Sequence, residues 1–423
     1  MALALSRCRR PDLWRPAVRA LASAAGEAQV LVMNAGSSSF KFAVLPGAGE
    51  MFRGQVEQLD TPQCRLLLKG KEPEALPNTG LKDAVRLVIE RLPDGGHSLS
   101  GVGHRIVHGG MSLYRPTRID AKVLEEIRQV VPLAPLHNPA GITAIEAALQ
   151  ALPGLRERHV ACFDTGFHHN LLPQAQMYAI PQDLARALKI RKYGFHGISC
   201  ESAYRRGCEA LSFRPDSDHT RIIIMHLGAG CSATGVIGGR SIDTTMGMTP
   251  LEGLMMSTRC GSIDPGIEKY ICDALDVSIG EVETILNKKS GLLGVSGVSA
   301  DMRTVLEYET KGTPEQQEAC RLATHLWVYR LSKVIASLFV PLQHVNGLIF
   351  TGGIGENSAE IRKRVLENFG YRGVQVDDGL NAANGDQHGI ITSPVSTIPA
   401  VVVKADEEAE IAKATRKLLA ETV

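Results

Sequence analysis

The sequence contains one unit twice: a short apolar run, a tight glycine-containing turn and a second apolar run. The first copy is VLVMNAGSSSFKFAVL, from Val30 to Leu45, and the second is RIIIMHLGAGCSATGVI, from Arg221 to Ile237. Short apolar runs with β-branched residues predict buried strands, and the glycines predict the turns that join them. Two copies of one hairpin indicate two related domains that face a shared cleft.

The turn of the first hairpin brings several phosphate-binding groups together. It offers free backbone amides, the hydroxyls of 37–39 and the cation of Lys41. Such a set suits a phosphate or a metal-bound phosphate, although an ordinary serine-rich hairpin turn explains this segment alone equally well.

A third glycine turn has a different context. TGGIGEN, at 351–357, follows a predicted strand at Gly347–Phe350 and precedes a predicted helix at Ser358–Phe369, with Ser358 as its N-cap. Backbone amides at a positive helix end suit a nucleotide. Three turns of this kind in one chain favour a nucleotide site over three unrelated turns.

Length and composition narrow the class of protein. A chain of 423 residues exceeds one compact core and predicts two domains. The formal net charge of +1 gives no electrostatic case for nucleic acid, and no apolar run approaches the about 18 residues of a membrane span. The nine cysteines form no C-x-x-C pair, which favours free thiols over disulfides or a zinc site.

The first 27 residues differ from the rest of the chain. MALALSRCRRPDLWRPAVRALASAAGE contains five arginines, and Asp12 is its only acid before Glu27. This composition predicts a mitochondrial transit peptide and a location in the matrix. The alternative is a disordered or mis-assigned N-terminus on a cytoplasmic protein.

The remaining pattern divides the chain into two domains after the leader. We expect the junction between them near residue 164, where the predicted strand at Val160–Phe163 ends. Besides the hairpins, the pattern predicts helices at Leu81–Leu92, Lys122–Val131, Ala140–Leu152 and Glu407–Ala420, and strands at Gly101–Gly110, Val160–Phe163 and Val401–Val403.

Ten motifs together identify a family that the chain resembles. In chain order they are VLVMNAGSSSFK, GHRIVHGG, PLHNPA, FDTGFH, RKYGFHGIS, HLGAG, TMGMTPLEGLMMSTRCG, SADMR, FTGGIGEN and ADEE. The chain resembles the acetokinase family of the sugar kinase/heat-shock ATPase/actin superfamily. The resemblance implies an α/β fold of two duplicated ribonuclease H-like (actin-like ATPase) domains around a central nucleotide cleft. It places residues 28–164 with 400–423 in the N-terminal domain and 165–399 in the C-terminal, nucleotide-binding domain. It also implies a homodimer and reversible, Mg²⁺- (or Mn²⁺-) dependent phosphoryl transfer from ATP to acetate, giving acetyl phosphate and ADP.

The resemblance assigns roles in the reaction to particular residues. Acetate is already ionised at pH 7, so catalysis requires positioning and charge neutralisation more than a strong base. His196 and Arg259 match the residues that stabilise the transferring phosphoryl group. Asp164 matches the catalytic aspartate, and we expect it to orient His196, Arg259 or Mg²⁺-bound water. Arg105 matches the acetate-binding arginine, whose fork suits a carboxylate.

The remaining site residues follow from the same motifs. Asn34 and Glu407 match the magnesium positions, and two protein oxygens suffice for Mg²⁺ beside phosphates and water. The acetate methyl pocket matches Val107, Leu136, Phe195 and Pro250. The nucleotide and phosphate positions match Ser37, Ser39, Lys41, His226, Leu227, Gly228, Ala229, Gly230, Asp301, Met302, Arg303, Gly352, Gly353, Ile354, Gly355 and Glu356.

Three departures from the family pattern leave alternatives open. Ala229 replaces the asparagine of HLGNG, Cys200 replaces a histidine, and Ser262 replaces a common aspartate. A propionate or butyrate kinase is an alternative, because one methylene in an apolar pocket discriminates by only about 1–3 kcal/mol. A second alternative is a catalytically weakened, nucleotide-binding regulatory homologue. A sugar kinase is disfavoured, because a sugar needs several hydrogen-bonding groups.

Overall fold

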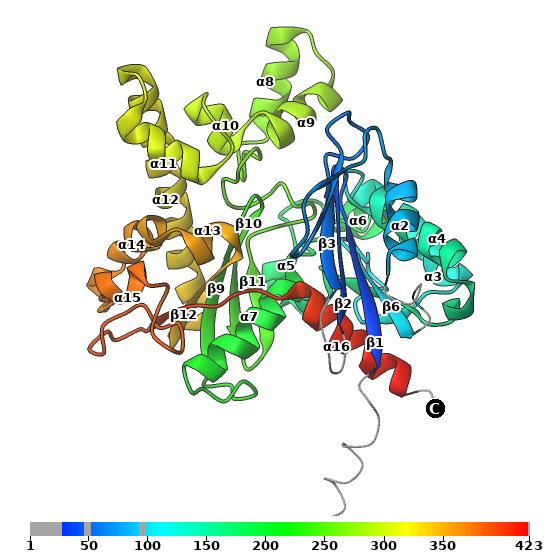
Figure 1. The fold of residues 1–423 in the computed structure, drawn as a ribbon. Coiled ribbons are helices and arrows are strands. Elements are labelled where there is room, and N and C mark those ends of the chain that lie inside the picture. The colour runs from blue at the N-terminus through cyan, green and yellow to red at the C-terminus, as the bar shows by residue number, and fades with distance from the viewer. Residues whose placement is uncertain (1–27, 46–51, 93–95, 97, 422–423) are drawn as a thin grey trace, which may run out of the picture.

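The chain forms two halves, each built around a mixed β-sheet (Figure 1). The computed structural model describes residues 28–45, 52–92, 96 and 98–421, so the predicted transit peptide lies outside the described residues. The first sheet has the order β5 (Glu74–Ala75), β4 (Arg65–Leu68), β3 (Phe52–Glu57), β2 (Ser39–Leu45), β1 (Gln29–Ala35), β6 (Leu99–Ile106), β8 (His159–Phe163) and β7 (Thr117–Arg118). The second has the order β11 (Arg240–Thr244), β10 (Cys231–Ile237), β9 (Arg221–Leu227), β12 (Gly347–Thr351) and β13 (Ala400–Val402).

The two sheets share one topology. In the first, β3, β2 and β1 pair antiparallel, and β1, β6 and β8 pair parallel. In the second, β11, β10 and β9 pair antiparallel, and β9, β12 and β13 pair parallel. The repeated hairpins are therefore the central pairs β1–β2 and β9–β10. Asn34 and His226 occupy the same place, the sixth residue of the central strand.

Helices cover both faces of the first sheet, which explains why β1 is apolar throughout. Leu31 and Met33 pack toward α2 (Leu81–Glu90) and α4 (Asn138–Ala151), and α3 (Ala121–Gln129) packs beside α4. The intervening Val30 and Val32 pack with Ile411 of α16 (Glu407–Ala420) on the other face. This alternation is the period of two that a strand imposes.

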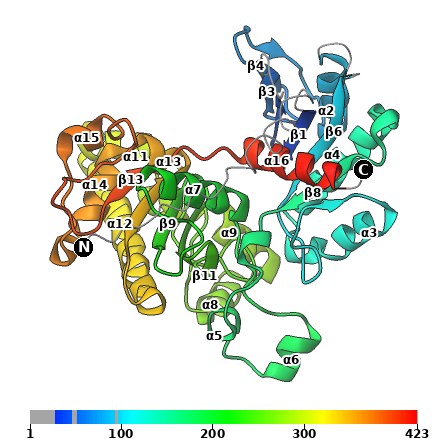
Figure 2. The ribbon, with the colours of Figure 1, turned by 90° about the horizontal axis from the view of Figure 1, so that it is seen from below.

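The two halves exchange helices. α7 (Gly197–Ala210) follows the first sheet but packs on β9, β12 and β13, whereas α16 follows the second sheet but packs on β1, β2, β6 and β8 (Figure 2). Each contact is close at a glycine. A Cβ on Gly103 would lie 2.6 Å from the Ile411 side chain, and a Cβ on Gly207 would lie 2.2 Å from that of Ile349. The exchange therefore joins the two halves.

The predicted return of the chain to the first half lies too early. β13 pairs with β12 in the second sheet, so the chain crosses back after Val402 rather than at residue 400. The closing helix itself has the predicted bounds, Glu407–Ala420.

A long helix covers the other face of the second sheet, and smaller helices extend from this half (Figure 1). α12 (Pro314–Leu342) packs on β10, β9 and β11. The other helices are α5 (Pro173–Gln176), α6 (Gln182–Ala187), α8 (Gly266–Leu275), α9 (Ile279–Lys288), α10 (Gly291–Ser296), α11 (Met302–Lys311), α13 (Gly352–Asn357), α14 (Ala359–Glu367) and α15 (Asp378–Ala382), with short 3₁₀ turns at Val131–Leu133, Pro153–Leu155, Gly166–His168 and Gly370–Arg372.

The third glycine turn is shorter than predicted. α13 begins directly after β12, at Gly352, so most of TGGIGEN is helical. Ser358 caps the next helix as predicted, because its side chain accepts a hydrogen bond from the Ile361 amide. The backbone therefore turns sharply at Gly352, whose φ of +78° suits a glycine.

Two composition-based expectations are reflected in the described residues. Every cysteine from Cys64 to Cys320 is a free thiol. Among the helices in the described ranges, none combines the length and apolar character that a membrane crossing requires.

Candidate active site

Arg105 lies at the centre of a polar cluster where three parallel strands end. Asn34 comes from the end of β1, Arg105 from the end of β6, and Asp164 from the residue after β8. Arg105 Nη1 donates to Asn34 Oδ1 at 3.0 Å, and Arg105 Nε donates to Asp164 Oδ1 at 3.1 Å. A second Arg105–Asp164 contact makes this ion pair two-pronged. Ligand sites in α/β proteins form at such carboxyl ends of strands.

Glu407 joins this cluster from α16. It is the first residue of the helix, and its carboxylate lies 3.7 Å from Arg105 Nε. Burial raises the pKa of Asp164 to about 6; the positive charge of Arg105 opposes this rise and the negative charge of Glu407 adds to it. The Asp164 carboxylate contacts Arg105, and among the described residues it makes no hydrogen bond or ion pair with the side chain of His196 or Arg259.

Asp164 reaches His196 only through the backbone. Its carbonyl accepts a hydrogen bond from the Gly197 amide at 2.8 Å, directly after His196. His196 has a φ of +59°, an uncommon conformation for a residue with a side chain. The close fit of the Gly197 backbone against Asp164 holds this conformation, since a Cβ on Gly197 would lie 2.2 Å from the Asp164 carbonyl oxygen.

His196 and His226 form a stacked pair of imidazoles across the site. Their ring centres are 4.1 Å apart. His196 Nδ1 lies 3.0 Å from Ser232 Oγ, and His226 Nδ1 lies 2.7 Å from Ser199 Oγ. Burial lowers the pKa of His196 well below 6.5, and the neighbouring His226, Arg105 and Arg259 lower it further. His196 is therefore neutral at pH 7.

His196 and Arg259 converge above the second glycine turn. A Cβ on Gly230 would lie 3.1 Å from His196 Nε2 and 3.5 Å from Arg259 Nη1. In the tautomer in which Nδ1 accepts from the Ser232 hydroxyl, Nε2 carries the proton and is a donor. The site thus presents an imidazole N–H and a guanidinium beside the bare backbone of Gly230, which suits the equatorial oxygens of a phosphoryl group.

The second and third glycine turns lie next to each other. A Cβ on Gly228 would lie 3.8 Å from the Gly353 amide nitrogen. Glu356 Oε1 accepts hydrogen bonds from the backbone amides of Gly352 and Ala405, each at 3.1 Å. Glu356 therefore ties the start of α13 to the crossing segment 403–406 that leads to Glu407.

The predicted methyl pocket is assembled in part. Val107 and Phe195 are buried in one apolar cluster, and the Pro250 carbonyl accepts from Arg259 Nη1 at 3.4 Å. Leu136 is 40% exposed. The next residue, His137, places its Nε2 3.3 Å from Arg259 Nη2. We did not predict His137 as a site residue, although the PLHNPA motif contains it.

The remaining predicted nucleotide residues are placed less centrally. Lys41 and Ser37 are exposed, and Ser39 is half-buried. Asp301 caps α11 and pairs with the exposed Arg303. Leu227, Met302 and Ile354 pack in the apolar core rather than pointing at a polar site.

The three departures have identifiable surroundings. Ala229 is exposed in its turn, and its carbonyl accepts from the Ser257 amide. Cys200 is fully buried, with its Sγ 3.7 Å from Thr234 Oγ1. Ser262 accepts a hydrogen bond from the Gly253 amide, a local bond that a carboxylate at this position would also be able to make.

Comparison with known proteins shows which family the chain is similar to. The Acetokinase family pattern matches residues 29–413. An acetate kinase of Deinococcus deserti is 43% identical over 399 residues, covering 92% of this chain and 98% of the relative. A propionate kinase of Salmonella typhimurium is 40% identical, covering 90% and 94%.

Solved structures share the fold over nearly the whole chain. The acetate kinase of Porphyromonas gingivalis has a TM-score of 0.84 at 34% identity, covering 93% of this chain and all of that one. A propionate kinase of Francisella tularensis has a TM-score of 0.85 at 37% identity, covering 92% and 99%. These neighbours confirm the predicted α/β fold of two duplicated actin-like ATPase domains. The chain belongs to the acetokinase family.

Proposed function

We propose that the protein is a Mg²⁺- (or Mn²⁺-) dependent acetate kinase that transfers the γ-phosphoryl group of ATP reversibly to acetate. The observation that carries the proposal is the pairing of two clusters. Arg105, held by Asp164, offers a carboxylate-binding fork, while His196 and Arg259 converge over the phosphate turn at Gly230. The first cluster suits the acceptor and the second suits the transferred group.

The reaction needs no proton transfer. One carboxylate oxygen of acetate forms a bond to the γ-phosphorus as the bond from that phosphorus to the bridging oxygen breaks, and the electron pair of that bond leaves with ADP. Arg105 orients the acetate carboxylate, and Asp164 fixes the guanidinium. His196 Nε2–H and Arg259 donate to the phosphoryl oxygens, where negative charge spreads in the transition state.

The residues present fit a magnesium ion. Asn34 Oδ1 and the Glu407 carboxylate are oxygen donors that both lie beside Arg105. The described residues contain no group of three or more His, Cys, Asp or Glu side chains able to hold a metal by themselves. This donor set matches Mg²⁺, which uses few protein oxygens together with phosphates and water. An ion held by Asn34 and Glu407 would neutralise phosphate charge.

Assembly as a homodimer belongs to the same proposal. Several large apolar side chains are exposed on the segment that contains α5 and α6, which projects from the body of the molecule (Figure 2). Exposed apolar patches of this kind mark contact surfaces. The residues are Leu172, Met177, Ile180, Leu184 and Leu188. Light scattering coupled to size exclusion measures the mass, and a monomer at micromolar concentration contradicts this part.

A hydroxylamine-trapping assay with ATP, Mg²⁺ and acetate tests the proposed function. Acetyl phosphate formation is expected with the purified protein, and loss of kcat/KM for acetate is expected in Arg105→Ala. Parallel assays with propionate and butyrate rank the acyl substrates, because several relatives are propionate kinases. ATP binding without turnover on any of the three acids instead supports a regulatory homologue.

A further inference from the structure

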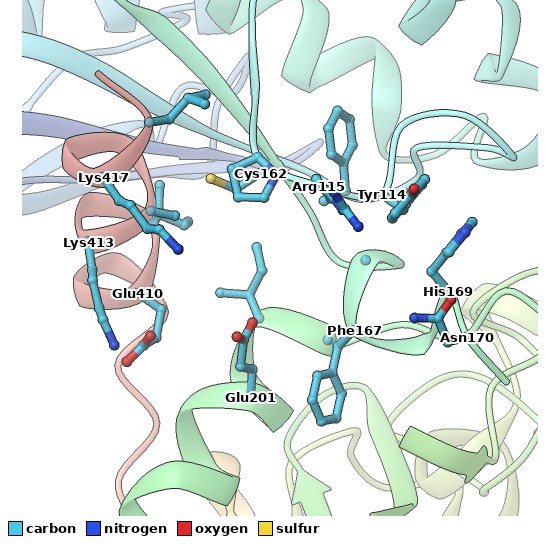
Figure 3. A pocket seen from close by; sticks show the side chains of 18 of the residues that line it. Tyr114, Arg115, Cys162, Phe167, His169, Asn170, Glu201, Glu410, Lys413 and Lys417 are labelled. Atoms are coloured by element: carbon cyan, nitrogen blue, oxygen red, sulfur yellow. The ribbon is translucent and has the colours of Figure 1, made fainter. Parts of the chain in front are cut away.

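A cavity lies between the two exchanged helices α7 and α16 (Figure 3). It has a volume of about 840 Å³, and its walls also include the end of β8 and the segments 114–116 and 166–170. We call it the hinge pocket. The volume lies within the roughly 300–1,000 Å³ that is typical of small-molecule sites.

The hinge pocket is separate from the proposed active site, but the same chain segments contribute residues to both. Asn34, Arg105, Asp164, His196, Arg259 and Glu407 are not among its lining residues. Residues next to them in the chain do line it. Phe163 precedes Asp164, Gly197 follows His196, and Glu410 lies about one helical turn after Glu407. A molecule in the hinge pocket therefore touches the two helices whose first turns adjoin catalytic residues.

The charged side chains of the hinge pocket are unevenly paired. Arg115, Lys413 and Lys417 line it together with Glu201, Glu410 and Glu421. Glu410 forms an ion pair with Arg205, which does not line the pocket. Three basic groups then face two acidic ones.

Arg115 and Lys417 are the basic groups that have no acidic partner. Among the ion pairs of the described residues, neither of them appears, whereas Lys413 lies near enough to Glu201 to favour its ionised form. Arg115 and Lys417 point into the cavity from two sides, and Glu201 points in from α7 (Figure 3). The Glu201 side chain is exposed and offers a carboxylate acceptor to a ligand.

We propose that the hinge pocket binds a small organic anion with two negative charges and a hydroxyl group, and that this ligand modulates turnover. Arg115 and Lys417 hold the anionic groups, and Glu201 accepts a hydrogen bond from the hydroxyl. The ligand bridges α7 to the first half of the molecule, so it changes kcat without competing with ATP or acetate. The proposal goes beyond the phosphoryl transfer and does not depend on which acid is phosphorylated.

Isothermal titration tests the binding, with the active site occupied by ADP, Mg²⁺ and acetate, a combination that has no phosphoryl group to transfer. Malate and glycerol 3-phosphate are titrated separately, which distinguishes a dicarboxylate from a phosphate ester. Saturable binding of at least one is expected, with affinity at least tenfold weaker in Arg115→Gln/Lys417→Gln. Lys122→Gln, a charge removal on α3 outside the pocket, is the matched control and is expected to bind like the wild type.

Two further measurements distinguish a specific site in the hinge pocket from non-specific anion binding. Glu201→Gln is expected to keep binding succinate as tightly as the wild type but to lose the preference for malate. Binding that survives unchanged in the double variant, or no binding of either probe, overturns the site. Binding with no change in kcat overturns the modulating role. Thermal unfolding at the wild-type temperature shows that each variant is folded.

Discussion

The Arg105 guanidinium is clamped by the Asp164 carboxylate, which is 1% exposed. The same guanidinium contacts Asn34 Oδ1 and lies beside Glu407. Arg105 therefore links the acceptor side of the site to both proposed metal ligands. The contacts with Asp164 and Asn34 use three of the five guanidinium N–H donors, so donors on Nη1 and Nη2 remain for the acetate carboxylate, while the two-pronged contact with Asp164 keeps the guanidinium orientation fixed.

The pH dependence of Asp164→Asn tests this link. The pKa of Asp164 is raised to about 6, chiefly by burial. Asp164 takes up a proton as the pH falls through about 6, so the ion pair weakens and kcat/KM for acetate falls on the acidic side. Asp164→Asn is expected to lower kcat/KM by about tenfold to a hundredfold at pH 7.5, since a hydrogen bond to a charged group contributes about 1.5–3 kcal/mol.

In the same variant, kcat/KM for acetate is also expected to lose the decrease near pH 6 that the wild type shows. Acetate itself ionises at lower pH and affects both proteins equally, so it is an internal control. An asparagine variant with an unchanged limb near pH 6 rules out Asp164 as the titrating group.

Removing the Glu407 charge tests the metal assignment. Glu407→Gln keeps the size of the side chain but weakens an oxygen ligand, so the half-saturating Mg²⁺ concentration is expected to rise about tenfold or more. Glu408→Gln is the matched control, because Glu408 follows on the same helix and lies near Arg53 instead. If the two variants have the same half-saturating Mg²⁺ concentration, Glu407 is not a ligand of the metal.

The local elements were predictable because their residues determine them. Val30–Met33 alternates between two buried faces, and glycines mark both hairpin turns. The expected domain bounds already assign α7 to the second half and α16 to the first, whereas the contacts that hold α16 there, such as Gly103 with Ile411, join residues far apart in sequence and were not predictable. The helical start at Gly352 was missed because glycines disfavour helices, and the Glu356 carboxylate overrides that preference through the Gly352 amide.

The site was predictable mainly through the family motifs. Strand ends explain why Asn34, Arg105 and Asp164 meet, and the repeated hairpin explains why a second glycine turn, with Gly230, lies between the central strands β9 and β10 of the other half. The hydrophobic periodicity of a sequence does not indicate which side chain pairs with a buried charge. The pairing of Asp164 with Arg105 rather than His196, and the approach of His137 to Arg259, became visible only in three dimensions.

Glu356 gives a prediction about the third glycine turn. Glu356→Ala removes the acceptor for the Gly352 and Ala405 amides, so α13 and the segment before Glu407 lose their connection. We expect KM for ATP to rise about tenfold, because each lost hydrogen bond contributes about 0.5–1.5 kcal/mol. Glu356→Gln retains one oxygen acceptor and is expected to stay within about threefold of the wild type.

A surface control accompanies the Glu356 variants. Asp378→Ala breaks an exposed pair with Lys363 and is expected to leave the kinetics unchanged. If alanine and glutamine at position 356 give the same KM for ATP as Asp378→Ala, the connection through Glu356 has no kinetic role.

Import by the leader is a prediction from composition alone. A fluorescent reporter fused to residues 1–27 is expected to enter mitochondria of a cultured eukaryotic cell, because the segment is rich in arginine and nearly free of acids. The control fusion replaces the five arginines with glutamine and is expected to stay in the cytosol. A wild-type fusion that also stays there argues for a cytoplasmic protein.

The last prediction concerns Ala229, in the turn that holds Gly230 beside His196 and Arg259. The backbone of this turn is intact, since the Gly228 amide donates to the Gly230 carbonyl at 3.0 Å. Ala229 is exposed, so a longer side chain fits without displacing the core. Ala229→Asn adds an amide donor beside the phosphate turn, and one hydrogen bond to a charged group is typically worth about 1.5–3 kcal/mol. We therefore expect KM for ATP to fall, or kcat to rise, by about tenfold.

Ala229→Ser is the comparison, because its short hydroxyl has less reach from the turn and is expected to give little gain. Both variants are measured at saturating acetate and Mg²⁺, so that only the nucleotide step differs. A bound water is able to supply the missing donor in the wild-type protein. If Ala229→Asn is no better than Ala229→Ser, such a water or another group already fills that place, and the alanine is a neutral departure from the family pattern.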